Sequence, residues 1–292
     1  QYGDTPLFYG QTYNAPVKLD VKGNMCVPVE KKGHAQYAPA PKVEGEKDRY
    51  VVTGYKNSYV YMDEFKMLFP RMHSAQPHHV EAYKSWADVK GKKVRYDYCG
   101  QQKTEYCPTF GENLKFFFRY QVNFMYWRYF MWNFAGRQND IQSHGELTKG
   151  NWISGIPFID NTMLGDQSKL PSELRDNKGH NVYYLLPLIL GVIGLLWQLG
   201  KRQNEGKNKD GYRSFAIVFL LFFLTGLAIV VYLNQTPYQP RERDYAYAGS
   251  FYAFCIWIGL GVMAIVDLLN RLVKNEKAQT ALAVAAVLFT LL

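Results

Sequence analysis

The last third of the chain contains four apolar runs, and their length constrains the fold more than any other feature. Residues 182–199, 215–233 and 249–269 form complete runs, and residues 278–292 begin a fourth. A helix rises about 1.5 Å per residue, so each complete run spans roughly 27 to 33 Å and can cross the hydrocarbon core of a bilayer. We therefore expect a membrane protein that is mainly α-helical, with transmembrane helices over 182–292.

Basic residues in the connections between these runs predict the orientation of the helices. The connections 200–214 and 270–277 are rich in Lys and Arg, which favour the cytoplasmic side of a membrane. If both lie in the cytoplasm, the connection 234–250 lies on the opposite side, together with residues 1–181. The charged connection and the polar first part of the chain are thus expected in one non-cytoplasmic compartment.

Residues 1–113 are expected to form a soluble, non-cytoplasmic α+β module. Segments 17–29 and 49–61 alternate in polarity and carry β-branched or aromatic residues, which is typical of short strands. The segment 30–48 is rich in Lys, Gly and Pro and is expected to be an exposed loop. A helix is expected over 79–89.

Three histidines of this module, His73, His78 and His79, suggest a metal site at first sight. However, no Cys or carboxylate lies beside them at a spacing typical of zinc. His78 and His79 are adjacent, so on a helix or a strand their side chains point in different directions. We therefore predict no metal site there.

The four cysteines are too few to form a disulfide framework in a chain of 292 residues. Cys99 and Cys107 are candidates for a disulfide if their segment faces an oxidising compartment. Two free thiols are the alternative.

The net charge of +9 raises the possibility of nucleic-acid binding. The lysines, however, form no clustered basic and aromatic pattern of a recognised nucleic-acid module. Anionic lipid headgroups are the partner that this charge favours, and no nucleic-acid partner is predicted.

Residues 114–181 are expected to form an aromatic helix followed by a loop. Eleven side chains between residues 115 and 136 are Phe, Tyr or Trp, but polar and charged residues such as Arg119 and Arg128 interrupt them. A lone spanning helix tolerates such residues poorly. We expect this helix to lie at the membrane interface or to pack against other membrane helices, because Trp and Tyr prefer the headgroup level. The alternative is a buried core helix of the soluble module.

The loop after this helix carries residues that can line a polar site: Arg137, Asp140, His144 and Trp152. Loops on a rigid scaffold carry a large share of functional residues. The alternative is a loop that only ends the helix, with Arg137 and Asp140 satisfying one another.

The connection 234–250 carries four consecutive charged residues: Arg241, Glu242, Arg243 and Asp244. Pro237 and Pro240 already supply what a turn requires. Ionisable groups at a membrane boundary are costly unless they are paired, hydrated or bound to a charged group, so their default interpretation is a functional site. The alternative is a set of Arg–carboxylate pairs that only holds the helix ends at the headgroup layer.

Several short phrases of the chain resemble a bacterial membrane family that is catalogued as a domain of unknown function and labelled protein O-mannosyltransferase-like. The phrases are GRQND at 136–140, GNWISG at 150–155, LNQTP at 233–237, QPRERDY at 239–245 and AGSFYA at 248–253. Members of that family are longer, with a multi-spanning region before this part, so the chain is expected to be an internal fragment. The resemblance implies an inner (cytoplasmic) membrane location with the large module on the periplasmic side.

The resemblance also implies a function, because the family's multi-spanning region is similar to the GT-C glycosyltransferases. These enzymes transfer a sugar from a polyprenyl-phosphate donor to a protein or lipid acceptor on the outer face. Their catalytic acid usually lies in the first outward loop, which no position of this chain matches, so the catalytic residue is unknown.

The arginines of the charged connection fit a phosphate-bearing donor, because Arg binds phosphate in a bidentate manner. Arg241 and Arg243 are expected to bind the donor phosphate, beside Tyr245. Glu242 and Asp244 are expected to hold the guanidinium groups or, less favourably, to bind a divalent cation. The alternative is a non-enzymatic membrane assembly or scaffold protein that uses its outward module for docking.

Overall fold

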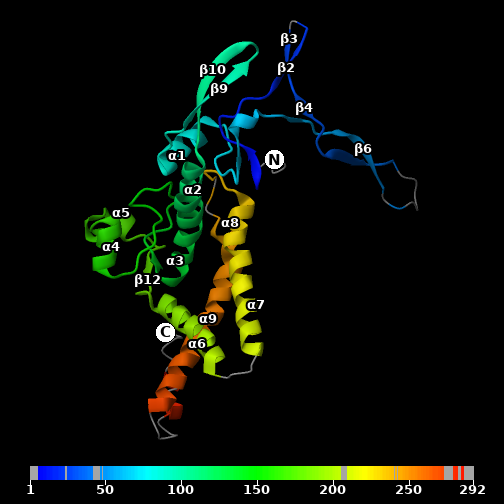
Figure 1. The fold of residues 1–292 in the computed structure, drawn as a ribbon. Helices are drawn as coiled ribbons and strands as arrows, with labels where there is room; N and C mark the ends of the chain where they lie inside the picture. The colour runs from blue at the N-terminus through cyan, green and yellow to red at the C-terminus, as the bar shows by residue number, and fades with distance from the viewer. Residues whose placement is uncertain are drawn as a thin grey trace. The chain divides into compact units, whose positions relative to one another are not determined.

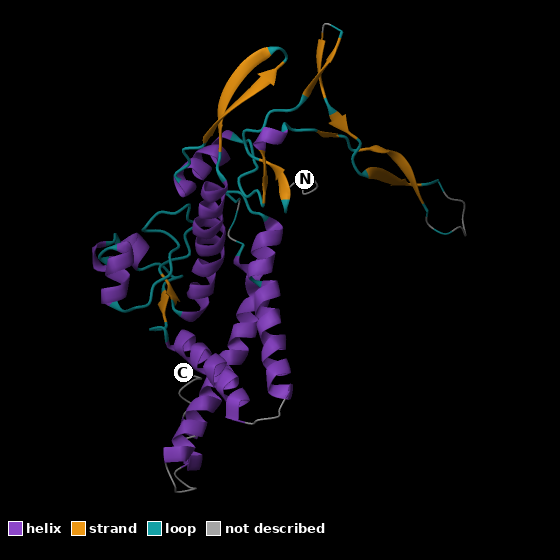
Figure 2. Cartoon of the chain, viewed as in Figure 1, coloured by secondary structure: helices purple, strands orange, loops and turns teal. Residues whose placement is uncertain are grey.

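The computed structural model describes residues 6–23, 25–41, 47, 49–204, 209–239, 241, 243–272, 279–281 and 284–285. It is a mixed α+β structure that divides into two compact units, Gln1–Arg119 and Tyr120–Leu292 (Figures 1 and 2). The division lies within a helical stretch that begins at Phe110, continues as a π-helix over Phe117–Trp127 and ends with α3 (Arg128–Phe134).

The strands of the first unit form small antiparallel sheets of two strands each (Figure 2). They are β1 (Tyr9–Gln11), β2 (Leu19–Lys22), β3 (Met25–Pro28), β4 (Glu30–Lys31), β5 (Ala35–Pro39), β6 (Tyr50–Tyr55), β7 (Ser58–Tyr59), β8 (Lys66–Leu68), β9 (Lys92–Tyr98) and β10 (Gln101–Cys107). The pairs are β1 with β8, β2 with β3, β4 with β7, β5 with β6, and β9 with β10. These strands confirm the α+β character predicted for the module and the strands predicted within 17–29 and 49–61.

The prediction of an exposed loop over residues 30–48 is wrong in part, because β4 and β5 lie within it. β5 pairs with β6 from Ala35 opposite Tyr55 to Pro39 opposite Tyr50. β-propensity depends strongly on the partner strand, so a segment rich in Lys and Pro becomes a strand where a suitable partner lies beside it. Residues 42–46 and 48, between the two strands, lie outside the described residues.

The first unit also contains a 3₁₀ turn at Asp63–Phe65 and the helices α1 (Pro77–Ala87) and α2 (Phe110–Phe116). α1 confirms the helix expected at 79–89, shifted by two residues because Pro77 fits the first turn of a helix. α2 begins with a capping box, in which the Thr109 N–H donates to the Glu112 carboxylate at 2.7 Å and the Glu112 N–H donates back to the Thr109 hydroxyl at 3.3 Å.

The disulfide of the first unit joins Cys26 to Cys99, with 6.2 Å between the two Cα atoms. The candidate pairing of Cys99 with Cys107 is therefore wrong, and Cys107 is a buried free thiol. Cys107 is the last residue of β10, whereas Cys99 lies in the turn between β9 and β10. The antiparallel register places Cys107 opposite Lys92, seven residues before Cys99, so the hairpin holds the two thiols at its opposite ends.

The second unit is mostly helical. After α3 it contains β11 (Gly136–Arg137), α4 (Pro157–Leu164), a 3₁₀ turn at Gln167–Lys169, α5 (Ser172–Arg175), β12 (Asn181–Val182), α6 (Leu186–Asn204), α7 (Lys209–Thr225), α8 (Leu227–Leu233), a 3₁₀ turn at Asp244–Tyr247 and α9 (Ala248–Leu272). Gly226 separates α7 from α8, so the second predicted run is a helix with a break rather than one continuous helix.

Two apolar helices of this unit could span a membrane, Tyr212–Leu233 and Asp244–Arg271, with mean hydropathies of 2.8 and 2.1. Only 11% and 28% of the residues in their most apolar windows are buried, and unburied apolar surface is costly in water and favourable in lipid. The apolar part of α6, Leu186–Gly200, is shorter than the run predicted there. The fourth predicted run, 278–292, and the predicted cytoplasmic connection 270–277 lie largely outside the described residues.

α6 and α9 cross at close range through glycines. A methyl group added to Gly194 would collide with the backbone of Trp257, and one added to Gly261 would collide with the backbone of Leu190. Small residues let two helix backbones approach closely, which is how helices pack where lipid removes the hydrophobic driving force.

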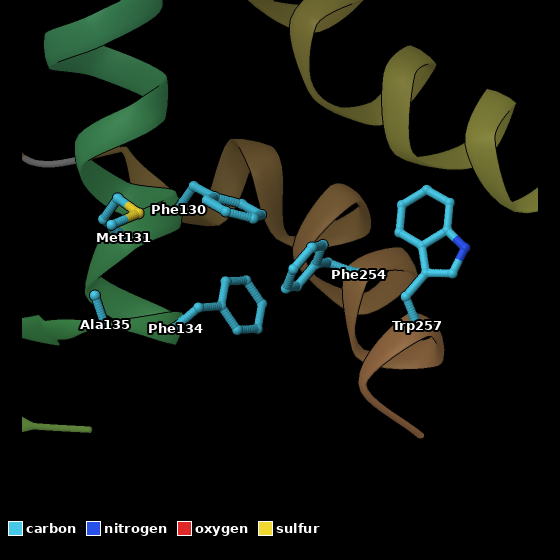
Figure 3. Packing of buried hydrophobic residues seen from close by; sticks show 6 residues of the cluster. All are labelled: Phe130, Met131, Phe134, Ala135, Phe254 and Trp257. Carbon is cyan, nitrogen blue, oxygen red and sulfur yellow. The ribbon is translucent and has the colours of Figure 1, made fainter. Parts of the chain in front are cut away.

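The aromatic helix packs against α9 (Figure 3). Phe130 and Phe134 of α3 place their ring centroids 4.8 Å and 4.6 Å from that of Phe254, and Trp257 extends the same cluster. The buried face of the aromatic stretch therefore contacts another helix of the second unit. Of the two arrangements expected for this helix, packing against the apolar helices is the one that the structure contains.

Candidate anion-binding site

The turn between α8 and α9 is fixed to the π-helix by a buried polar network. The Gln121 side-chain amide donates to the Asn234 side-chain oxygen at 3.1 Å and to the Gln235 carbonyl at 2.9 Å. The Tyr120 hydroxyl donates to the Thr236 carbonyl at 3.3 Å. A π-helix is rare and often marks a functional site, and here it presents Tyr120 and Gln121 together to the turn.

The end of the turn is held by Tyr126 of the π-helix and by Tyr247 of the 3₁₀ turn at Asp244–Tyr247. The Tyr126 hydroxyl donates to the Ser250 hydroxyl at 3.3 Å, and the Tyr247 hydroxyl donates to the Gln235 side chain at 3.4 Å. The Tyr126 and Tyr247 rings meet edge to face with centroids 5.3 Å apart. The turn is thus anchored at both of its ends.

Two of the sequence phrases that carry the family resemblance pair with one another in the loop after α3. The Gln138 N–H donates to the Asn151 carbonyl at 2.9 Å, and Arg137 pairs with Trp152 in an antiparallel bridge. Buried Asn139 accepts the Gly150 N–H at 2.7 Å. The phrases at 136–140 and 150–155 are therefore the two sides of one loop.

This loop also reaches the turn between α8 and α9. The Gln142 side-chain amide donates to the Gln239 carbonyl at 2.8 Å, and the His144 ring lies 4.9 Å from the Tyr238 ring. The Glu146 carboxylate accepts the His144 N–H at 2.6 Å, and this hydrogen bond holds the pKa of Glu146 below its ordinary value. The two segments singled out in the sequence thus lie side by side.

Two arginines lie among the aromatic rings of α3. The guanidinium of buried Arg128 donates to the Phe124 and Gly150 carbonyls at 3.0 Å and 2.8 Å and lies 5.0 Å from the Trp132 ring centroid. The guanidinium of Arg137 lies 4.9 Å from the same centroid. Both positive charges therefore meet the faces of aromatic rings, an arrangement that stabilises a desolvated cation.

Six buried hydrogen-bonding atoms of the second unit have no partner among the described residues. Gln121 Oε1 and Gln235 Nε2 belong to the polar network above, and the other four are Tyr129 Oη, Trp132 Nε1, Arg137 Nε and Arg243 Nε. A continuous series of contacts links the side chains of these four. Arg137 lies over Trp132, the Trp132 and Tyr129 centroids are 5.0 Å apart, Tyr129 stacks on Tyr247 at 6.4 Å, and Arg243 interacts electrostatically with Tyr247.

Buried donors without a partner are uncommon and costly, so a group of them calls for a ligand, an ion or water that accepts their hydrogen bonds. The Trp132 indole and the two arginines can only donate, the Tyr129 hydroxyl can donate as well as accept, and the two arginines are positively charged. The arrangement therefore suits an anion. We refer to Tyr129, Trp132, Arg137 and Arg243 as the donor cluster.

The site residues predicted from the sequence differ in how far they are buried. Arg137, Trp152 and Arg243 are half-buried, whereas the remaining described ones are exposed: Asp140, His144, Arg241, Asp244 and Tyr245. Asp140 lies beside Asn177 and Gly179, and its backbone N–H donates to the Asn177 side chain at 3.5 Å. Asp140 therefore does not pair with Arg137, so the interpretation of a helix end in which these two satisfy one another is wrong. Glu242 lies outside the described residues.

Sequence reasoning missed several residues that shape this region. Gln121, Arg128, Tyr129 and Trp132 all lie in the aromatic stretch, which we expected to lie at the membrane interface or to pack against other membrane helices. The polar residues within that stretch were the available signal, because a Gln or Arg inside an aromatic helix needs a buried partner. No group of three His, Cys, Asp or Glu side chains capable of holding a metal occurs among the residues that the structure describes.

Comparison with known proteins gives one family match. Residues 3–118 match a family of unknown function, DUF8416. The match covers the first unit, whereas the phrases that resemble mannosyltransferase-like proteins lie between residues 136 and 253, so it does not support that resemblance. No curated protein matches the chain, and no solved structure does.

Proposed function

We propose that this protein binds the phosphate of a lipid-linked sugar donor through the donor cluster and takes part in transferring the sugar to a protein or lipid acceptor. The single observation that carries the proposal is the buried Nε of Arg243, which has no partner within the described residues. Arg243 immediately precedes the helix Asp244–Arg271, one of the two that could span a membrane.

The position of Arg243 in the chain favours a lipid ligand. A polyprenyl-phosphate donor keeps its chain in the bilayer and its phosphate at the headgroup layer, where the end of a spanning helix also lies. An arginine at that level offers a planar fork with two parallel N–H groups to the phosphate oxygens. Arg137 and the indole of Trp132 add donors from the neighbouring loop and helix.

The chemistry that follows is charge stabilisation rather than proton transfer. When the bond between the sugar and the donor phosphate breaks, negative charge grows on the leaving phosphate. Fixed donors that are already desolvated stabilise this charge without reorganising. The donor cluster would hold the leaving group, and a base for the acceptor hydroxyl is not assigned to any residue.

The test uses the protein purified from its native membrane and reconstituted in liposomes with a radiolabelled polyprenyl-phosphate sugar and membrane acceptors. Arg243→Ala is expected to lower transfer about a hundredfold, as loss of a positioned donor to a developing charge does. Arg243→Lys keeps the charge but loses the fork, so it should recover only part of the rate.

A matched control is Arg271→Ala, because Arg271 is an exposed arginine paired with Asp267 at 3.1 Å at the other end of the same helix. It should transfer at the wild-type rate. Unchanged transfer in Arg243→Ala would refute the role of the cluster. Wild-type protein that neither binds the donor nor transfers the sugar would refute the transferase function and favour an assembly or scaffold protein.

A further inference from the structure

A cavity of about 570 Å³ lies in the first unit, between β8, β9 and the segment that leads into α2. Its volume is within the range of pockets that bind small ligands or short chain segments. Five charged side chains line it: Glu64, Lys66, Lys92, Lys93 and Arg95. The positive charges outnumber the single negative one.

Three of these cations are available for an anionic partner. Lys66 pairs with Asp63 at 2.7 Å, but Lys92, Lys93 and Arg95 have no carboxylate within ion-pair distance in the part of the chain that is described. Met67, Val94, Pro108 and Phe110 add an apolar surface beside the charges. The cavity therefore suits a ligand that carries negative charges next to apolar groups.

The backbone of β9 indicates what kind of ligand fits. Four consecutive residues, 92–95, line the cavity. Successive side chains of a strand point to opposite faces, so consecutive residues line one cavity when it lies along the edge of the strand. Among the described strands β9 pairs only with β10, so its other edge has no partner strand among them, and the cavity lies beside β9 and the end of β10 at Cys107.

We propose that an extended acidic peptide segment binds in this cavity by adding a strand to the free edge of β9. Backbone hydrogen bonds to a free edge give affinity for any extended peptide, and side-chain contacts give selectivity. Here Lys92, Lys93 and Arg95 select acidic side chains, and Val94 and Phe110 contact apolar ones.

The same charges have a simpler interpretation, because natural proteins place Lys and Arg along free edges to prevent strands from adding. Positive charges repel basic segments and must be desolvated beside uncharged ones, but they attract acidic segments. The cavity beside the edge distinguishes this strand, since a blocked edge needs no space for a second chain.

The test measures binding of a fluorescein-labelled peptide of alternating Glu and Val to the whole chain in detergent micelles by fluorescence anisotropy. The triple variant K92A/K93A/R95A should bind about tenfold more weakly, since each exposed ion pair contributes a few-fold. The control K22A/K31A/K84A removes the same charge from exposed positions outside the cavity and should bind as the wild type does.

A second peptide with alternate backbone amides N-methylated keeps every charge but cannot pair with a strand, and it should not bind. The Cys107 thiol lines the same cavity, so in a C255S variant the Glu–Val peptide should slow alkylation of Cys107. Equal binding of the methylated peptide would refute strand addition. Equal losses in both triple variants, or tighter binding of oligogalacturonate than of the peptide, would refute the acidic-peptide site.

Discussion

The Gln121 side-chain amide donates to the Asn234 side-chain oxygen at 3.1 Å, between two residues that are 113 positions apart in the chain. Asn234 ends α8 in the left-handed conformation, with a φ of 42°. Asn tolerates this conformation better than other residues with a Cβ, and its side chain bonds locally while it does so. One side chain thus both ends α8 and receives the hydrogen bond that fixes the following turn.

Gln121→Leu is expected to destabilise the second unit by about 1 to 3 kcal/mol, because the buried Asn234 oxygen and Gln235 carbonyl lose their donor. The matched control is Asn123→Leu, since Asn123 is an exposed residue on the same π-helix. Thermal unfolding in detergent measures both. If the two substitutions cost the same, the hydrogen bonds of Gln121 do not stabilise the turn.

Asn234→Gly separates the two roles of Asn234. Glycine adopts a positive φ without strain, so this variant loses the buried side chain and its hydrogen bonding without adding backbone strain. Asn234→Ala loses the hydrogen bond and adds backbone strain, and it should be less stable than Asn234→Gly. Equal unfolding temperatures for the two variants would show that the left-handed conformation carries no cost here.

The glycines of α9 give a further prediction. Gly261→Ala should destabilise the packing of α6 on α9 by about 1 to 3 kcal/mol, because its methyl group would collide with the Leu190 backbone. A helix backbone cannot move aside as a flexible side chain can. Gly259→Ala, on the same helix with nothing within 4 Å of the added methyl, should be neutral or slightly stabilising. Unfolding of both variants in the same detergent is the measurement, and a destabilised Gly259→Ala with an unaffected Gly261→Ala would contradict the close crossing.

The Cys26–Cys99 disulfide closes a long loop, with 73 positions between the two residues. In the chain-entropy model such a cross-link contributes on the order of 4 kcal/mol, so the variant C26S/C99S should expose the first unit to proteolysis at lower temperature. C107S should leave the resistance of the first unit to proteolysis nearly unchanged, because Cys107 is a free thiol. A wild-type chain whose alkylation pattern is the same with and without reductant would contradict the pairing.

The apolar helices and the α+β first unit follow from local sequence, because a long apolar run or a short alternating strand is specified by residues close together in the chain. The disulfide and β5 do not. Within the first unit Cys99 has two possible partners, Cys26 and Cys107, and the register of the β9–β10 hairpin places Cys107 out of reach. β5 forms because β6 lies beside it, which composition does not reveal.

The candidate site, too, could be predicted from the sequence only in part. The loop with Arg137 and the turn with Arg243 stand out as charged or polar phrases between apolar runs. The partners that complete the donor cluster, Tyr129 and Trp132, look like any other aromatic residue of their helix. Their unpaired polar atoms are a property of packing, and no pattern in the sequence records them.

His73 makes the first unit sensitive to acid. The pKa of His73 is lowered to about 4, chiefly by burial and also by the nearby charges of Arg71 and His79. The hydrogen bond from the ring to the Arg71 carbonyl at 3.4 Å opposes this shift. In the unfolded chain a histidine titrates near 6.5. Below about pH 6.5 the His73 ring is therefore protonated in the unfolded state but still neutral in the folded state. Stability is therefore full above that pH and falls as the pH drops towards 4, by on the order of 3 kcal/mol.

Hydrogen–deuterium exchange of α1 peptides between pH 7 and pH 5, corrected for the intrinsic exchange rate, measures this loss. His73→Gln should remove most of the dependence of stability on pH between pH 7 and pH 5. A smaller dependence should remain, because burial also lowers the pKa of His79. His34→Gln changes an exposed histidine of the same unit and should leave the pH dependence unchanged. The carboxyl groups of Asp88 and Glu112 have lowered pKa values, so their contributions are lost only at more acidic pH. A pH dependence that survives intact in His73→Gln would show that His73 does not cause the loss of stability.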